Sequence, residues 1–392
     1  MMATIMMIGG MGGWSDAIRW DAMEPRIQIT PLGDVHANIS FQETVLQPFG
    51  RATTRSTIDR SVRDYALNLK EPEFQETESL ELEPNFLAAI EEQFGASVDT
   101  LRKFVDFIEN MGIRERRAVL ELRREDLLHA QLHGVDLDRS EVENLVEFLT
   151  FKGRSSWREV PDGFDAKDLF PWRFRRRLSV LRKPLIQIDD NDPDPRFLVA
   201  PGVVRDAFVY MFANYHRGDF PIWQLSPAMK KWAGGSRRRQ GSAFASEVAE
   251  RLKELGWKTE TEVAVTKLLG KGYDRDYGDV DVLASRSGSA RVLLIECKDV
   301  QFRKTEGEIA EQLSDFRGLS RPDGKPDLLL KHLNRIDLIA RESSTLARYL
   351  KADGALDVEG HLVFKNMVPM KYAWEHMKER IALHVFDDLD EI

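Results

Sequence analysis

Two short apolar segments of the chain carry charged residues at alternate positions. Asp279 and Asp281 lie in "GDVDVLA", and Glu296 and Lys298 end "RVLLIECK". On a β-strand alternate side chains share a face, so each pair points to one side of its strand. Carboxylates that gather together repel and raise one another's pKa unless a cation holds them, and oxygen ligands at that density suit Mg²⁺ or Mn²⁺. A metal-bound water beside a lysine is a nucleophile suited to a phosphodiester.

This chemistry requires the two segments to be neighbouring strands. "GDVDVLA" (278–284) and "RVLLIECK" (291–298) are joined by the short polar turn "SRSGS". Such a turn predicts an antiparallel hairpin. If its register aligns the charged faces, three acids and a lysine converge at one end of a small sheet.

The surrounding pattern predicts the elements of a compact α/β layer from about residue 241 onward. The order is helix, three strands, helix, helix, strand. The predicted helices are "SAFASEVAERLKELGW", "EGEIAEQLSDF" and "DLLLKHLNRIDLIARESSTLARYL", and the further strands are "KTETEVAVTKL" and "GHLVFKN".

The segment "GDVDVLA…LLIECK" resembles the PD-(D/E)xK nuclease superfamily, whose fold is restriction-endonuclease-like. It is especially similar to the branch of Mrr-like restriction enzymes and archaeal-type Holliday-junction resolvases. In that branch a G-(D/E)-x-D-hydrophobic strand precedes an E-x-K strand, and the core is αβββαβ. The resemblance covers about residues 241–370. It implies that Asp281 and Glu296 bind the metal and that Lys298 is catalytic. Asp279 is either a further metal ligand or a cap at the turn after Tyr277 and Gly278.

The family often adds a glutamate from the helix before the sheet. Ala245 stands where the resolvase pattern often has it. Glu247 or Glu250 could substitute, and we favour Glu247 because it immediately precedes the apolar "VA" step. The helix after the sheet often contributes a glutamine, for which Gln312 is the candidate, and its role would be to position the water.

Local basic stretches, more than net charge, decide whether a polyanion can bind. The formal net charge is −9, which argues against a chain coated in basic residues. Even so, "PWRFRRRLSVLRK" (171–183) and "PAMKKWAGGSRRRQ" (227–240) contain no acids. The first stretch either binds phosphates or pairs with acids of the helical region. From the second stretch and a later helix we predict contacts with nucleic acid, DNA before RNA, at Lys230, Lys231, Arg237, Arg238, Arg239, Lys331 and Arg335.

The remainder of the chain carries no recognisable chemistry. The glycines of "IGGMGGWSD" lack the lysine of a phosphate-binding loop, so a flexible N-terminus is the prediction. "LKEPEFQETESLELEPN" (69–85) is acidic and punctuated by proline, which is typical of a linker. "AGGS" (233–236) predicts a hinge before the last domain.

These patterns together predict an α+β protein with a C-terminal α/β restriction-endonuclease-like core and a mainly helical N-terminal region. That region would bind a partner protein, a substrate or a second copy of the chain. The predicted divisions are an N-terminal segment with linker (1–83), a helical domain (84–165), a basic helical connector (166–240) and the nuclease-like domain (241–392).

Composition sets the broad class. The hydrophobic fraction is 42% and the charged fraction 31%, ordinary values for a soluble globular protein. No apolar run approaches the roughly 20 residues that cross a bilayer. The single cysteine, Cys297, excludes an internal disulfide and argues against a thiolate zinc site. We therefore expect a cytoplasmic protein without a membrane partner.

The function predicted from these residues is that of a divalent-metal-dependent nuclease. The first expectation is a DNA endonuclease in genome defence or restriction, and the second is a role in repair or recombination. The alternative is an inactive relative that keeps the fold as a nucleic-acid-binding or scaffold module. The complete acid–acid–lysine set favours the enzyme, because a decayed relative is expected to lose it.

Overall fold

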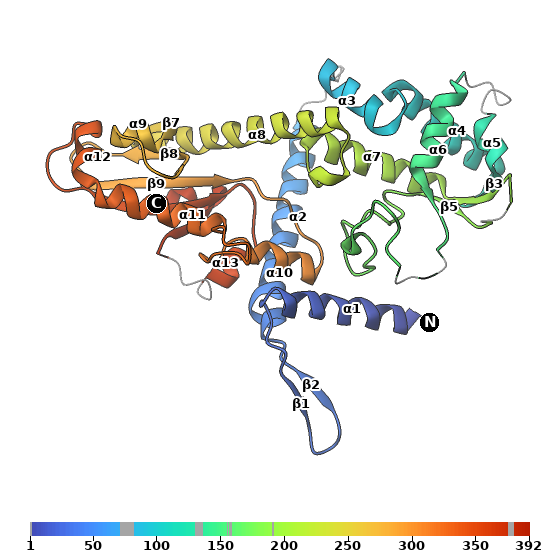
Figure 1. Cartoon of the computed structure of the whole chain (residues 1–392), viewed down its shortest axis with the longest axis horizontal. Helices are drawn as coiled ribbons and strands as arrows, with labels where there is room; N and C mark the ends of the chain where they lie inside the picture. Colours follow the sequence, from blue (N-terminus) through green and yellow to red (C-terminus); the bar gives the residue numbers. More distant parts are fainter. Residues whose placement is uncertain are drawn as a thin grey trace. The chain divides into compact units, whose positions relative to one another are not determined.

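The computed structural model has an α+β fold made of two compact units (Figure 1). Unit 1 comprises Met1–Phe74 with Arg239–Ile392, and unit 2 comprises Gln75–Arg238. Most of the predicted linker at 69–85 lies outside the described residues. The structure describes residues 2–70, 82–129, 136–154, 156, 159–189, 192–374 and 380–392.

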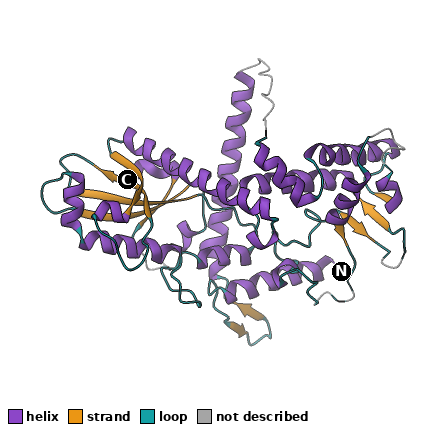
Figure 2. Ribbon diagram, turned by 45° about the horizontal axis from the view of Figure 1, so that its top comes forward, coloured by secondary structure: helices purple, strands orange, loops and turns teal. Residues whose placement is uncertain are grey.

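In the part of the chain that the structure describes, unit 1 is organised around a five-stranded sheet with the order β11-β10-β9-β8-β7. Figure 2 draws the strands in orange among the purple helices. β7, β8 and β9 are antiparallel neighbours, whereas β10 runs parallel to both β9 and β11. The predicted hairpin is confirmed, with Val282 opposite Ile295. The strands are β7 (Lys258–Ala264), β8 (Asp279–Ser285), β9 (Arg291–Lys298), β10 (Asp357–Phe364) and β11 (Ala382–Val385).

Helices cover both faces of this sheet, which explains why its central strands are almost continuously apolar. The C-terminal part of α8 (Pro227–Glu254) packs Phe244 and Leu252 on the face that carries Ile295. On the other face, α10 (Glu306–Ser314) and α11 (Leu328–Arg341) pack against Leu294 and its neighbours. The remaining helices of this region are α9 (Val265–Leu269), α12 (Ser343–Leu350), α13 (Met370–Ala373) and the 3₁₀ segment Phe386–Glu391.

The predicted hinge at "AGGS" is wrong, because α8 continues through residues 233–236 as helix. The reason is tertiary packing in unit 2. A Cβ on Gly218 would lie 2.9 Å from the Cα of Ala233, and the Ser236 hydroxyl donates to the His216 carbonyl at 2.9 Å. The small residues therefore permit a close approach to α7 (Pro201–Arg217) instead of breaking the helix.

The prediction of a flexible N-terminus is also wrong, since Met2–Arg19 forms helix α1 and packs against α10. The approach is close: a Cβ on Gly307 would lie 2.4 Å from the Cβ of Asp16. Ala17 and Phe41 join the same core as Ile309 of α10. The N-terminal residues thus contribute to the core of unit 1. The elements that follow α1 are β1 (Ile27–Ile29), β2 (Val35–Ala37), the π-helical turn Gln42–Leu46 and α2 (Gln47–Lys70).

Unit 2 is mainly helical, as predicted for this part of the chain. Two of its described helix starts are capped by side chains: Ser97 accepts from the Thr100 amide and Asp138 from the Glu141 amide. A small mixed sheet was not predicted, because its strands are very short. The elements are α3 (Pro84–Phe94), α4 (Val98–Glu115), α5 (Arg124–Leu128), α6 (Arg139–Leu149) and α7, with β3 (Leu120–Arg123), β4 (Thr150–Phe151), β5 (Leu185–Gln187), β6 (Arg196–Val199) and the 3₁₀ turns Ala166–Asp168 and Ile222–Gln224.

Candidate active site

The β8–β9 hairpin brings Asp281 and Glu296 to one face of the sheet. The observed register, continued by one position beyond Val282 and Ile295, places Asp281 opposite Glu296. Leu283 and Leu294 belong to the core on the α10–α11 side, so alternation directs the two acids to that side as well. The Asp281 Oδ2 accepts a hydrogen bond from the Cys297 amide at 2.7 Å. The two carboxylates are therefore neighbours at the end of the core strands.

Glu296 is the centre of a set of ion pairs. The Lys298 Nζ lies 2.5 Å from Oε1, and the Arg335 Nη1 lies 2.5 Å from Oε2. The His332 Nδ1 is farther from that second oxygen, at 3.8 Å. The Glu296 and Arg335 side chains are only 13% and 10% exposed, so these pairs are largely withdrawn from water. Each carboxylate oxygen of Glu296 thus already has a cation.

The surroundings drive the pKa values of the two acids apart. Burial, followed by the nearby charge of Glu296, raises the pKa of Asp281 to about 6. Burial would raise the pKa of Glu296 too, but Lys298 and Arg335 outweigh it and hold that pKa well below its ordinary value. For Lys298, the charges of Glu296 and Asp281 overcome burial and raise the pKa of the ammonium. Both carboxylates and the lysine are consequently charged at neutral pH.

Arg335 connects the two strands of the hairpin through α11. Its Nε donates to the Tyr277 carbonyl at 2.9 Å, just before β8, while Nη1 reaches Glu296 on β9. Gly278 lies between Tyr277 and β8 with φ +68°, and a Cβ there would be 3.4 Å from the Arg335 Nη2. The glycine of the "GDVD" motif therefore adopts the left-handed backbone conformation without strain and leaves space beside the Arg335 guanidinium.

The two carboxylates of the site can hold a hard divalent cation when water or phosphate supplies its other ligands. No group of three or more His, Cys, Asp or Glu side chains that could hold a metal occurs within the described residues. Two adjacent buried carboxylates are nevertheless enough for Mg²⁺, which usually keeps several waters and takes further ligands from phosphate. Asp281, whose pKa is raised by burial and by Glu296, is a carboxylate that a cation would stabilise. Asp281 and Glu296 are the residues that would hold it.

Not every predicted ligand lies beside Asp281 and Glu296. Asp279 is exposed at the start of β8, and its carboxylate has no ion pair in the described part of the chain. Glu247 pairs with Lys365 at 3.0 Å, whose ammonium lies over the ring of Phe244 on the α8 face. Glu247 therefore lies over the face opposite to Glu296.

Glu250 and Gln312 are also engaged elsewhere. Glu250 pairs with Lys253 at 2.6 Å on the exposed surface of α8. Gln312 is buried on α10, and its Nε2 donates to the Gln301 carbonyl at 2.9 Å. Gln312 thus holds the segment that follows Lys298.

The residues predicted to contact nucleic acid lie in different surroundings. The Arg237 guanidinium donates to the carbonyls of Gly218 and Phe220, at 2.7 and 3.0 Å. Arg335 belongs to the site itself. Arg237 is nevertheless exposed on α8, as are Lys230, Lys231, Arg238 and Arg239, and Lys331 is exposed on α11.

Sequence reasoning missed His332 and the contact of Arg335 with Glu296. His332 is fully buried, and its Nε2 lies 3.0 Å from the His361 carbonyl. Burial lowers the pKa of His332 to about 4, so its ring is neutral at neutral pH. The available signal was helical spacing, since both residues lie on the stripe of α11 that carries Leu329 and Ile336. Polar groups on a core stripe need partners.

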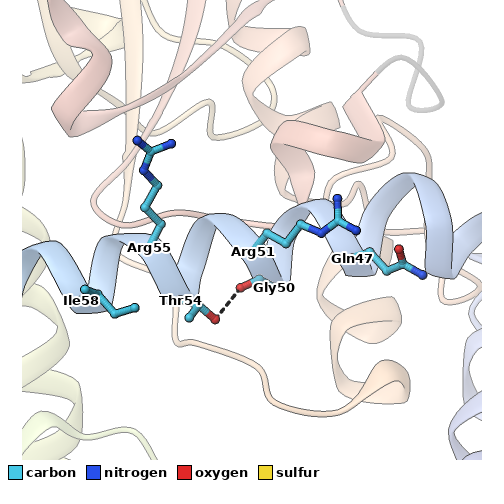
Figure 3. Close-up of a pocket in the computed structure, with 6 residues that line it drawn as sticks. All are labelled: Gln47, Gly50, Arg51, Thr54, Arg55 and Ile58. Carbon is cyan, nitrogen blue, oxygen red and sulfur yellow. Dashed lines mark hydrogen bonds between the residues drawn. The ribbon is translucent and has the colours of Figure 1, made fainter.

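A separate pocket of about 580 Å³ lies along α2 (Figure 3). Thr54 donates to the Gly50 carbonyl at 2.9 Å beside it. Among the residues that the structure describes, the lining contains no carboxylate, imidazole or thiol. Its lining residues are Gln47, Gly50, Arg51, Thr54, Arg55 and Ile58.

Fold and site define an α+β protein with a buried carboxylate–lysine–arginine cluster at a strand end. A family model described as anti-phage protein Upx-like matches residues 1–389. The chain therefore belongs to the Upx-like family of anti-phage proteins. No curated protein and no solved structure matches it. None of the described helices has the length and apolar character needed to cross a membrane. The expected setting in genome defence is consistent with this family, and the resemblance to PD-(D/E)xK nucleases stays a prediction.

Proposed function

We propose that this Upx-like protein acts against phage as a divalent-metal-dependent nuclease, with DNA as the first candidate substrate. The observation that carries the proposal is the convergence of Asp281, Glu296 and Lys298 at the end of the β8–β9 hairpin. The family description supports defence over repair or recombination as the setting.

Each residue has a role that follows from its contacts. A bound Mg²⁺ or Mn²⁺ would supply a water of lowered pKa and neutralise charge on the phosphate. Asp281 and Glu296 would hold that ion. Lys298 has a raised pKa, so it acts as a cation that stabilises developing negative charge and not as a general base. Gln312 fixes the segment after β9 through the Gln301 carbonyl.

A second candidate function is a non-catalytic module that binds nucleic acid or serves as a scaffold. One observation favours it: both oxygens of Glu296 are bonded to cations of the protein itself. Buried ion pairs of this kind also occur for purely structural reasons.

Digestion of plasmid, single-stranded DNA and RNA distinguishes the two candidates. We expect cleavage with Mg²⁺ or Mn²⁺, none with EDTA, and a loss of roughly 10²- to 10³-fold in Lys298→Ala. Lys325→Ala is the matched control, because Lys325 is 79% exposed in a loop outside the site. Equal cleavage under all of these conditions, or cleavage of no substrate by the folded wild type, would leave the scaffold function.

A further inference from the structure

The cations around Glu296 occupy the place that a metal would take. Its Oε1 is paired with Lys298 and its Oε2 with Arg335, both at 2.5 Å. Metal binding at Glu296 must therefore displace or share at least one of these partners.

The charges of the cluster sum to zero before any metal binds. Asp281 and Glu296 supply two carboxylates, and Lys298 and Arg335 supply two cationic groups, each 2.5 Å from an oxygen of Glu296. A divalent ion alone would leave an excess of two positive charges beside Lys298, Glu296 and Arg335, whose side chains are 10 to 25% exposed. Excess charge at such a site is costly, and a phosphate would reduce it.

The Arg335 guanidinium is placed so that it can bind a phosphate in place of the Glu296 carboxylate. Its Nε is fixed on the Tyr277 carbonyl at 2.9 Å, which holds the guanidinium at the strand end while Nη1 contacts Glu296. The planar guanidinium fork matches a phosphate as well as it matches a carboxylate. Lys298 is the more exposed cation, at 25%, and marks the side from which a phosphate would enter.

We propose that Arg335 is an internal counter-cation that competes with the metal for Glu296, so that the site loads metal tightly only when a nucleic-acid phosphate draws the guanidinium away. This inference rests on the proposed nuclease function and assigns its regulation. The protein without nucleic acid then binds the metal weakly, and a phosphate of the substrate makes the binding tight.

The test is Mn²⁺ binding without nucleic acid, measured by electron paramagnetic resonance on the full chain. Arg335→Gln should bind Mn²⁺ at least roughly tenfold more tightly than wild type, because one adjacent positive charge is gone. Arg335→Lys keeps the charge and should remain near wild type. The gain should vanish in the double variant Arg335→Gln/Glu296→Gln.

A second measurement uses wild type alone. A phosphorothioate oligonucleotide, which is charged and resists hydrolysis, should raise the affinity for Mn²⁺, whereas an uncharged methylphosphonate oligonucleotide should not. The proposal is overturned if a folded Arg335→Gln binds Mn²⁺ no more tightly than wild type. Should that variant fail to fold, an absent effect of the charged oligonucleotide overturns it instead. Affinities that change as expected without any cleavage reject the nuclease alone, and no Mn²⁺ binding by any form rejects both.

Discussion

Both units bury a cluster of charged side chains, and the two clusters are assembled differently. In unit 2, Asp168 pairs with Arg177 at 3.4 Å. Two further cations contact neutral groups: the Arg182 guanidinium lies 4.0 Å from the centre of the Phe220 ring, and the Lys183 Nζ donates to a backbone carbonyl at 2.5 Å. Burial lowers the pKa of Lys183 to about 8.

In unit 1 the cluster has two acids from adjacent strands and two cations. The acids face one another, which contributes to the raised pKa of Asp281. Glu296 is stabilised as an anion by Lys298 and Arg335.

The difference shows what a basic or acidic sequence pattern leaves open. The stretch 171–183 has the composition of a phosphate-binding patch, yet Arg182 and Lys183 are largely withdrawn and bonded within unit 2. A cluster prepared for an additional cation needs acids whose charge is only partly compensated. Asp281 meets that condition, because its raised pKa records a cost of ionisation.

The largest expected effect is on cleavage. Asp281→Asn removes a carboxylate that would hold the metal while keeping an oxygen for the Cys297 amide. We expect the rate to fall roughly 10²- to 10³-fold, the factor that several kcal/mol of lost charge stabilisation gives. Gel assays of plasmid cleavage measure it. Asp168→Asn is the comparison in unit 2 and should retain its rate per folded molecule. An equal loss of cleavage rate in the two variants would mean that both acids act only by supporting the fold.

The same two variants should have opposite effects on stability. Asp168→Asn leaves a buried guanidinium without its carboxylate, so we expect a loss of roughly 3 kcal/mol. Asp281→Asn removes a buried like charge beside Glu296, so we expect a gain of about 1–2 kcal/mol at neutral pH. Calorimetric scans of the full chain measure both. A destabilised Asp281→Asn would mean that the ionised aspartate is a net support of the fold.

The gain from Asp281→Asn should depend on pH. The pKa of Asp281 rises from 3.8 to about 6 on folding, so the native state binds the proton more tightly between these values. The contribution of Asp281 to the free energy of unfolding is therefore largest below about pH 4, falls as the pH rises to about 6, and is constant above that pH. Subtracting wild-type from variant unfolding free energies should give nearly zero at the acidic end and a plateau at neutral pH. A pH-independent difference would exclude this titration as its cause.

Much of unit 1 could be predicted from local periodicity. The hairpin and β7, β8, β9 and β10 follow from alternation and from the short polar turn between two apolar runs. α1 could not be predicted, because it packs against α10, nearly 300 residues later in the chain: a Cβ on Gly13 would lie 3.3 Å from the Glu306 Oε2, and one on Gly307 would lie 2.4 Å from the Asp16 Cβ. The sheet of unit 2 was hidden for the same reason, since Leu120 pairs with Val199 and each strand is only a few residues long.

The candidate site was predictable on its strands and unpredictable on its helices. Alternation places Asp281, Glu296 and Lys298 on one face regardless of the remaining chain. Which helix covers that face is a tertiary fact, so Arg335 was predicted as a surface contact although it bonds Glu296. The helix glutamate lies apart from the pair for a related reason: Glu247 belongs to the helix on the other face of the sheet.

The smallest expected effect tests the contact between Gly278 and Arg335 within unit 1. Gly278 and Gly288 both have positive φ, at +68° and +78°, so alanine at either position costs about 1 kcal/mol of backbone strain. Only at Gly278 would the added Cβ touch Arg335, at 3.4 Å, since nothing lies within 4 Å at Gly288.

Gly278→Ala and Gly288→Ala should therefore lose similar stability in thermal unfolding, with Gly278→Ala lower by a few tenths of a kcal/mol. The Mn²⁺ affinity tests the same contact, because the added Cβ would meet the guanidinium at van der Waals distance: a guanidinium displaced from Glu296 should raise the affinity of Gly278→Ala by roughly two- to threefold. Gly288→Ala should match wild type in that measurement. Identical Mn²⁺ affinities in the two variants would show that the guanidinium position does not control access to Glu296, and the distinction between a prepared and a purely structural cluster would then depend on Asp281 alone.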